Sequence, residues 1–126
     1  MGETRFTEEH HWLRIEEDGT ITIGITEYAQ EQLGDVVYVE LPQIEQEVLP
    51  GDEAAVVESV KTTSDIKAPI AGTVVEVNEK LADGPELVNK DPMGDGWLFR
   101  VQIGEEGVEL EEFMSEHSYQ EYVEGL

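Results

Sequence analysis

Short alternating stretches separated by turn residues constrain the fold of this chain more than any other feature of its sequence. Turn residues recur at Asp18-Gly19, Pro50-Gly51-Asp52 and Ala71-Gly72. Between them, apolar and polar residues alternate, as in segments 20–25 and 73–77. A period of two is typical of strands with one buried face, and closely spaced short strands indicate a small β-sandwich or barrel. The chain is therefore predicted to be mainly β.

Helices are predicted at two places. Thr26 has the residue type and position of an N-cap for a short helix that ends at Gly34. Apolar residues at helical spacing predict a C-terminal helical appendix over about 108–124. Ser118, with Glu121 three residues later, fits a capping box within it.

The remaining turn-rich segments are predicted to be loops. Segments 83–85 and 91–96 are rich in Gly, Pro and Asp, and we expect Lys80 and Lys90 beside them to lie in loops as well. A chain of 126 residues, 39% of them hydrophobic, is long enough to bury one ordinary core. Residues 1–126 are therefore predicted to form a single domain.

The charge of the chain excludes several kinds of partner. Its 30 Asp and Glu against 7 Lys and Arg give a formal net charge of −23 at pH 7, which repels nucleic acid and anionic membranes. No apolar run approaches the roughly 18 residues of a membrane-spanning helix and no export segment is recognisable, so a cytoplasmic location is expected. The acidity fits a surface for basic partners or solvation in a salt-rich prokaryotic cytoplasm, and the scarcity of lysine favours the second.

An independent active site is not expected. The chain has no cysteine, so it lacks a disulfide, a thiolate metal ligand and a cysteine nucleophile of its own. It also has neither a Gly-x-Ser-x-Gly motif nor a phosphate-binding Gly-rich loop. His10 and His11 are adjacent, and adjacent strand residues point to opposite faces, so we predict a surface or edge position and no metal site.

One of the four lysines has an unusual position. Lys61 lies between the predicted strands 53–60 and 66–68, within the polar segment 61–64 where a hairpin would reverse. Its amine is therefore expected at an exposed hairpin tip, which suits attachment of a group by a modifying enzyme. Its position alone does not exclude the alternative that Lys61 is an unmodified, solvated lysine in a turn.

The residues around Lys61 form a recognisable motif. Glu58-Ser59-Val60-Lys61, followed by Ser64-Asp65 and Ala68-Pro69-Ile70-Ala71-Gly72, resembles the lipoyl-lysine hairpin of the glycine cleavage system H protein family. The resemblance extends from about Thr4 to the C-terminus. Segments that match in the same order are 24–37, 85–89 and 91–97.

The resemblance implies a fold and a function. The family fold is a lipoyl/biotinyl-type barrel-sandwich hybrid with short helices, whose lipoyl-bearing hairpin corresponds here to about 53–70. Lipoate would be joined to Lys61 through an amide, and the chain would be a carrier and not an enzyme. The expected partners are glycine decarboxylase (P protein), aminomethyltransferase (T protein), dihydrolipoyl dehydrogenase (L protein) and the enzymes that attach lipoate. The chain itself is expected to be monomeric.

The resemblance also implies a cleft that protects an aminomethyl amine. Glu58 and Ser59 belong to the hairpin, and Asp65 and Glu9 are the carboxylates expected to contact the cargo. The family commonly has His-Glu before the Trp that corresponds to Trp12, whereas this chain has His-His, so His11 replaces a carboxylate. Asp65 as a plain turn residue remains an alternative.

Other functions stay open at this point. An H-like carrier for lipoate relay or sulfur metabolism would share the hairpin, and an unmodified acidic interaction module would share the charge. A biotin carrier is disfavoured because biotinyl lysines usually lie between methionines, whereas Lys61 lies between Val60 and Thr62.

Overall fold

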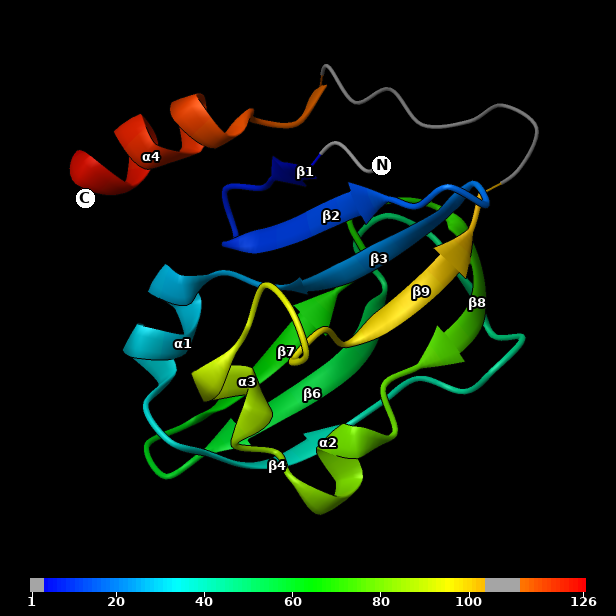
Figure 1. Cartoon of the computed structure of the whole chain (residues 1–126), viewed down its shortest axis with the longest axis horizontal. Helices are drawn as coiled ribbons and strands as arrows, with labels where there is room; N and C mark the ends of the chain where they lie inside the picture. Colours follow the sequence, from blue (N-terminus) through cyan, green and yellow to red (C-terminus); the bar gives the residue numbers. More distant parts are fainter. Residues whose placement is uncertain (1–3, 104–111) are drawn as a thin grey trace.

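Two antiparallel sheets form the computed structural model of this chain, which describes residues 4–103 and 112–126 (Figure 1). The larger sheet has the spatial order β1-β2-β3-β9-β8-β5, with β1 at Thr4–Phe6, β2 at His11–Ile15, β3 at Thr20–Ile25, β9 at Phe99–Gln102, β8 at Gly72–Val77 and β5 at Glu47–Val48. The smaller sheet has the order β4-β6-β7, with β4 at Val36–Glu40, β6 at Glu53–Ser59 and β7 at Thr63–Lys67. The prediction of a mainly β chain is confirmed.

Both sheets contribute to one apolar core. Its buried members include Leu13, Ile23 and Phe99 from the larger sheet and Val57 and Ile66 from the smaller one. The alternation in the sequence therefore produces two sheets, each with a face buried against the other.

The short helix after the first hairpin has the predicted ends. Helix α1 spans Glu27–Leu33, and the Thr26 hydroxyl accepts a hydrogen bond from the Ala29 N–H at 3.2 Å. Gly34 ends the helix with φ of 81°, in the left-handed region where glycine has no steric penalty.

Two further helices occupy segments that the sequence predicted as loops. Helix α2 spans Lys80–Asp83 and helix α3 spans Leu87–Lys90, so Lys80 and Lys90 are helical. Each helix is a single turn, too short to show a helical period in the sequence. Burial of Leu81 and Val88 in the shared core holds them in place.

The C-terminal helix begins earlier than its predicted capping box. Helix α4 spans Glu116–Glu124, and Ser115, not Ser118, is its N-cap, because the Ser115 hydroxyl accepts a hydrogen bond from the Ser118 N–H at 3.2 Å. Met114 pairs with Phe6 of β1 through two backbone hydrogen bonds of 2.9 Å, so the helix cannot start there. Positions 108–111 of the predicted appendix lie outside the described residues.

Close packing across β2 and β3 fixes the start of the larger sheet. Trp12 is fully buried opposite Gly24, and a Cβ at residue 24 would come within 2.7 Å of the indole ring. The indole N–H donates to the Pro92 carbonyl at 2.9 Å. Only glycine therefore fits at position 24 without moving Trp12.

Tyr119 fastens α4 to the rest of the protein, beside β1 (Figure 1). Its ring stacks on Phe6 with centroids 4.7 Å apart. Its hydroxyl lies 2.7 Å from Thr26 Oγ1 and 2.8 Å from His10 Nδ1. One buried hydroxyl thus joins α4, the N-cap of α1 and the residue that precedes β2.

No helix in the described part of the chain is long and apolar enough to cross a membrane.

Replacement of Tyr119 by phenylalanine tests this junction. Tyr119→Phe leaves Thr26 and His10 without their shared partner and is expected to lower the free energy of unfolding by about 1–2 kcal/mol. Tyr122→Phe is the matched control, because its hydroxyl makes an exposed 3.5 Å contact with the Glu8 carbonyl. Urea denaturation of both variants measures the difference, and equal losses would contradict this role of Tyr119.

Candidate functional site

The β6–β7 hairpin carries Lys61 on a turn that is held by one side chain. The predicted reversal over 61–64 is shorter in the structure, because β7 already begins at Thr63. The Ser59 hydroxyl accepts hydrogen bonds from the Lys61 N–H at 3.2 Å and the Thr62 N–H at 3.1 Å. It also donates to the Thr62 carbonyl at 3.1 Å. Ser59 is buried, so it fixes the turn from inside.

Lys61 is exposed at this tip, and its side chain lies along Gly34. A Cβ at residue 34 would come within 3.2 Å of Lys61 Cε. The backbone next to Lys61 is also bonded to this segment, because the Val60 N–H donates to the Asp35 carbonyl at 3.0 Å. The tip is therefore anchored to the link between α1 and β4.

Asn89 of α3 holds that link in place. Its Oδ1 accepts a hydrogen bond from the Val36 N–H at 2.8 Å. Its Nδ2 donates to the Gly34 carbonyl at 2.8 Å and to Gln30 Oε1 at 2.9 Å. The sequence singled out segment 85–89 by resemblance alone, and this structural task of Asn89 was not predicted.

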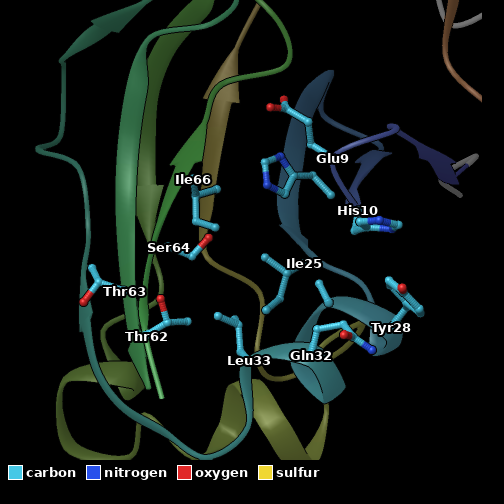
Figure 2. Close-up of a pocket in the computed structure, with 12 residues that line it drawn as sticks. Glu9, His10, Ile25, Tyr28, Gln32, Leu33, Thr62, Thr63, Ser64 and Ile66 are labelled. Carbon is cyan, nitrogen blue, oxygen red and sulfur yellow. The ribbon is translucent and has the colours of Figure 1, made fainter. Parts of the chain in front are cut away.

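A cleft of about 330 Å³ opens beside the hairpin (Figure 2). Figure 2 shows Thr62, Thr63, Ser64 and Ile66 on one side and α1 on the other. The side of α1 contributes Tyr28, Ala29, Gln32 and Leu33, Ile25 comes from β3, and Glu9, His10 and His11 complete the lining.

The predicted site residues divide between this cleft and the outer face of the smaller sheet. Glu9 and His11 line the cleft, as a cargo contact requires. Asp65 is not among the residues that line the cleft, although its neighbours Ser64 and Ile66 are. Asp65 and Glu58 are both exposed. Contact of Asp65 with a cargo therefore stays a prediction.

His11 is buried and so does not have the predicted surface or edge position, whereas His10 is partly exposed. His10 lies outside β2 with φ of 69°, an uncommon left-handed conformation for a residue other than glycine, and both histidines are among the residues that line the cleft. His10 Nδ1 is taken by the Tyr119 hydroxyl. The alternation rule fails here because the strand starts only at His11.

His11 is the most unusual polar group of the site. Its side chain is buried, with 5% of the residue exposed, and its Nδ1 has no hydrogen-bond partner in the described part of the chain. Burial lowers the pKa of His11 to about 4, while the Glu9 charge raises the pKa and His10 lowers it. The imidazole is therefore neutral at pH 7.

The sequence of this chain is similar to those of known proteins over nearly its whole length. A family model described as Glycine cleavage H-protein matches residues 4–125. The chain belongs to the glycine cleavage system H protein family. It is 53% identical over 119 residues to the glycine cleavage system H protein of Marinobacter nauticus, covering 94% of this chain and 91% of that protein. It is 54% identical over 118 residues to the corresponding protein of Thermotoga maritima, covering 94% of both.

A solved structure has the same fold. The crystal structure of a glycine cleavage system H protein from Mycobacterium marinum superimposes with a TM-score of 0.86 at 37% identity, covering 100% of this chain and 99% of that one. The expected lipoyl-type sandwich with short helices is confirmed. Members of this family carry lipoate, and an H protein is a carrier component of the glycine cleavage system and not a catalyst by itself.

The buried imidazole predicts a pH dependence of stability. Because the pKa of His11 in the folded state is about 4, against 6.5 for the ordinary group, protonation favours the unfolded chain as the pH falls through 6.5. Relative to His11→Phe, the wild type should lose about 3 kcal/mol of unfolding free energy between pH 7 and pH 4. Urea denaturation at several pH values measures this difference.

The control for this experiment is His117→Gln. The His117 side chain is 83% exposed. Its replacement should therefore leave the plot of unfolding free energy against pH parallel to that of the wild type. Parallel curves for His11→Phe and the wild type would show that the imidazole is not buried in its neutral form.

Proposed function

We propose that this chain is the lipoyl-bearing carrier of the glycine cleavage system. It would shuttle the aminomethyl group of glycine from the decarboxylating glycine dehydrogenase (P protein) to the aminomethyltransferase (T protein). It would pass electrons to dihydrolipoyl dehydrogenase (L protein). The observation that carries the proposal is an exposed Lys61, on a turn fixed by Ser59, next to a cleft in a chain of this family.

The residues around Lys61 fit a covalently attached arm. An exposed amine is accessible to a lipoate-attaching enzyme, and formation of an amide removes its charge. The lysine stem lies along Gly34, and the next residue, Thr62, already lines the cleft. His11, a buried residue, belongs to the lining of the same cleft.

Lipoate, when bound, supplies a dithiolane that can be reduced and can carry the aminomethyl group, which a chain without cysteine cannot do itself. The protein's own residues position that arm. Ser59 holds the turn from which it leaves, and Asn89 holds the link against which the lysine stem lies. Ile25, Leu33 and Ile66 give the cleft apolar walls that limit access of water.

The outer face of the hairpin is the part that a partner enzyme would meet. Glu58 and Asp65 are exposed there on either side of the Lys61 turn. We assign these two carboxylates to recognition by partner enzymes, including those that attach lipoate. The carrier would act as a monomer in the cytoplasm, where each partner in turn approaches this face.

The modification itself is the first test. Intact-mass measurement of the chain produced with lipoate and a ligase should show one added lipoyl group in the wild type and none in Lys61→Ala. Lys67→Ala is the matched control, because Lys67 is exposed on β7 of the same hairpin and should leave the addition intact. An addition that persists in Lys61→Ala would overturn the site. Lys61→Arg should abolish glycine decarboxylation in a reconstituted system, because guanidinium does not form the amide.

The acidic composition supports the proposal that this protein functions in a salt-rich cytoplasm. With a net charge of −23, repulsion among carboxylates destabilises the folded state in dilute buffer, and salt screens it as the Debye length falls from about 30 Å at 0.01 M to about 3 Å at 1 M. The midpoint of thermal unfolding should rise by several degrees over this range of NaCl, and KCl should give the same rise. A flat dependence would contradict the proposal.

A further inference from the structure

We propose that the enzyme that attaches lipoate docks on the outer face of the smaller sheet, on the exposed side chains of Val37, Tyr38, Glu58 and Val60. These four residues are called the Tyr38 patch below. The inference rests on the proposed function, because it needs Lys61 to be the residue that receives lipoate. The cleft takes no part in it, since none of the four residues is among those that line the cleft.

The register of the smaller sheet brings the patch together. Tyr38 of β4 pairs with Glu58 of β6, and residues that pair directly in an antiparallel sheet have their side chains on the same face. Both residues are exposed, so this face is the outer one. Val60 directly follows β6, and its bond to the Asp35 carbonyl keeps it beside the start of β4. The patch therefore lies at the end of the smaller sheet where the β6–β7 turn meets the link from α1 to β4 (Figure 1).

A β-bulge in β4 exposes two neighbouring apolar side chains. The pairing with β6 shifts between Val36 and Tyr38. In a regular strand successive side chains point to opposite faces, so one of two neighbours would be turned inward. Here Val37 is 50% and Tyr38 is 53% exposed, whereas Val36 and Val39 on either side of them are buried. Because bulges re-aim side chains, this one accounts for two apolar residues that reach solvent together.

Exposed apolar side chains gather at this place. Val37, Tyr38 and Val60, the last of them 67% exposed, are three of the seven large hydrophobic residues that are exposed in the described part of the chain. The other four are Ile44, Leu49, Val75 and Leu126. Contiguous apolar patches on a protein surface mark interaction sites, and tyrosine is enriched among the residues that carry binding energy. The Tyr38 patch therefore has the composition of the centre of a protein interface.

The position of the patch favours the attaching enzyme over the other partners. Attachment of lipoate takes place at the Lys61 amine itself, whereas the other partners act at the far end of the lipoyl arm. Val60 is the residue next to Lys61, and Ser59 fixes the turn that both belong to. An enzyme that binds this fixed surface holds the amine in position for formation of the amide.

The charge of the patch indicates the chemistry of the matching surface. Glu58 lies within the patch, and Glu40 is exposed further along β4. An arginine or lysine of the enzyme would make a charge-assisted hydrogen bond with Glu58, while apolar contacts around it exclude water. The enzyme surface that fits is therefore apolar at its centre and basic beside it.

A lipoate–protein ligase supplied with lipoate and ATP is the probe for this patch. Lipoylation rates of the full chain are followed by intact mass at several chain concentrations. Tyr38→Ser and Val60→Ser should each raise KM and lower kcat/KM by about tenfold or more, with kcat within about twofold of the wild type. Val75→Ser is the matched control, because Val75 is 41% exposed at a comparable register shift in β8 of the larger sheet, and it should keep wild-type kinetics.

Competition separates docking from the chemical step. Lys61→Ala has no acceptor amine at the turn but keeps the patch, so it should inhibit lipoylation of the wild type. Lys61→Ala combined with Tyr38→Ser should inhibit about tenfold less well. Because Tyr38 is exposed, Tyr38→Ser should unfold in urea at the same midpoint as the wild type, which checks that the fold is intact.

The outcomes distinguish this inference from the proposed function. Unchanged kinetics of Tyr38→Ser, a fall in its kcat with KM unchanged, or equal inhibition by the two competitors would overturn the docking patch and leave Lys61 as the lipoylation site. A wild type that gains no lipoyl group would overturn the proposed function, and the docking patch with it.

Discussion

The arrangement of the site depends on the hydrogen bonds of the Asn89 carboxamide. Its three hydrogen bonds join α3 to Gln30 of α1, to Gly34 and to the first residue of β4, Val36. The segment 34–36 in turn bonds the Lys61 turn through the Asp35 carbonyl and the Val60 N–H. An amide side chain with two donors and an acceptor suits a link whose backbone groups point in different directions. No apolar residue of the same size could satisfy them.

These hydrogen bonds of Asn89 explain why the cleft and Lys61 lie side by side. One wall of the cleft is α1, whose C-terminal end is fixed at Gly34, and the other begins at Thr62, directly after Lys61. Both walls are thus attached to the same link, residues 34–36. Loss of that link would separate the attachment point from the cavity even if the two sheets kept their shared core.

Much of this arrangement follows from local chemistry and could be predicted. The Asp18-Gly19 hairpin, the Thr26 cap and the Gly34 stop each depend on a few neighbouring residues, and all three match the structure. Features that depend on distant contacts could not be predicted. The single-turn helices α2 and α3 are held by core burial, and the left-handed backbone of His10 lies directly before β2 begins at His11.

The acidity of the surface and the selectivity of the cleft have different physical origins. At physiological salt the Debye length is about 8 Å, so most of the 30 carboxylates act on a cation in the cleft only through screened fields. Such fields attract sodium as readily as an amine. Discrimination requires contacts at close range in a poorly hydrated place, and the apolar side chains of Ile25, Leu33 and Ile66 make part of the cleft such a place. The exposed charge therefore governs solvation of the whole surface, whereas the residues that line the cleft govern its local polarity.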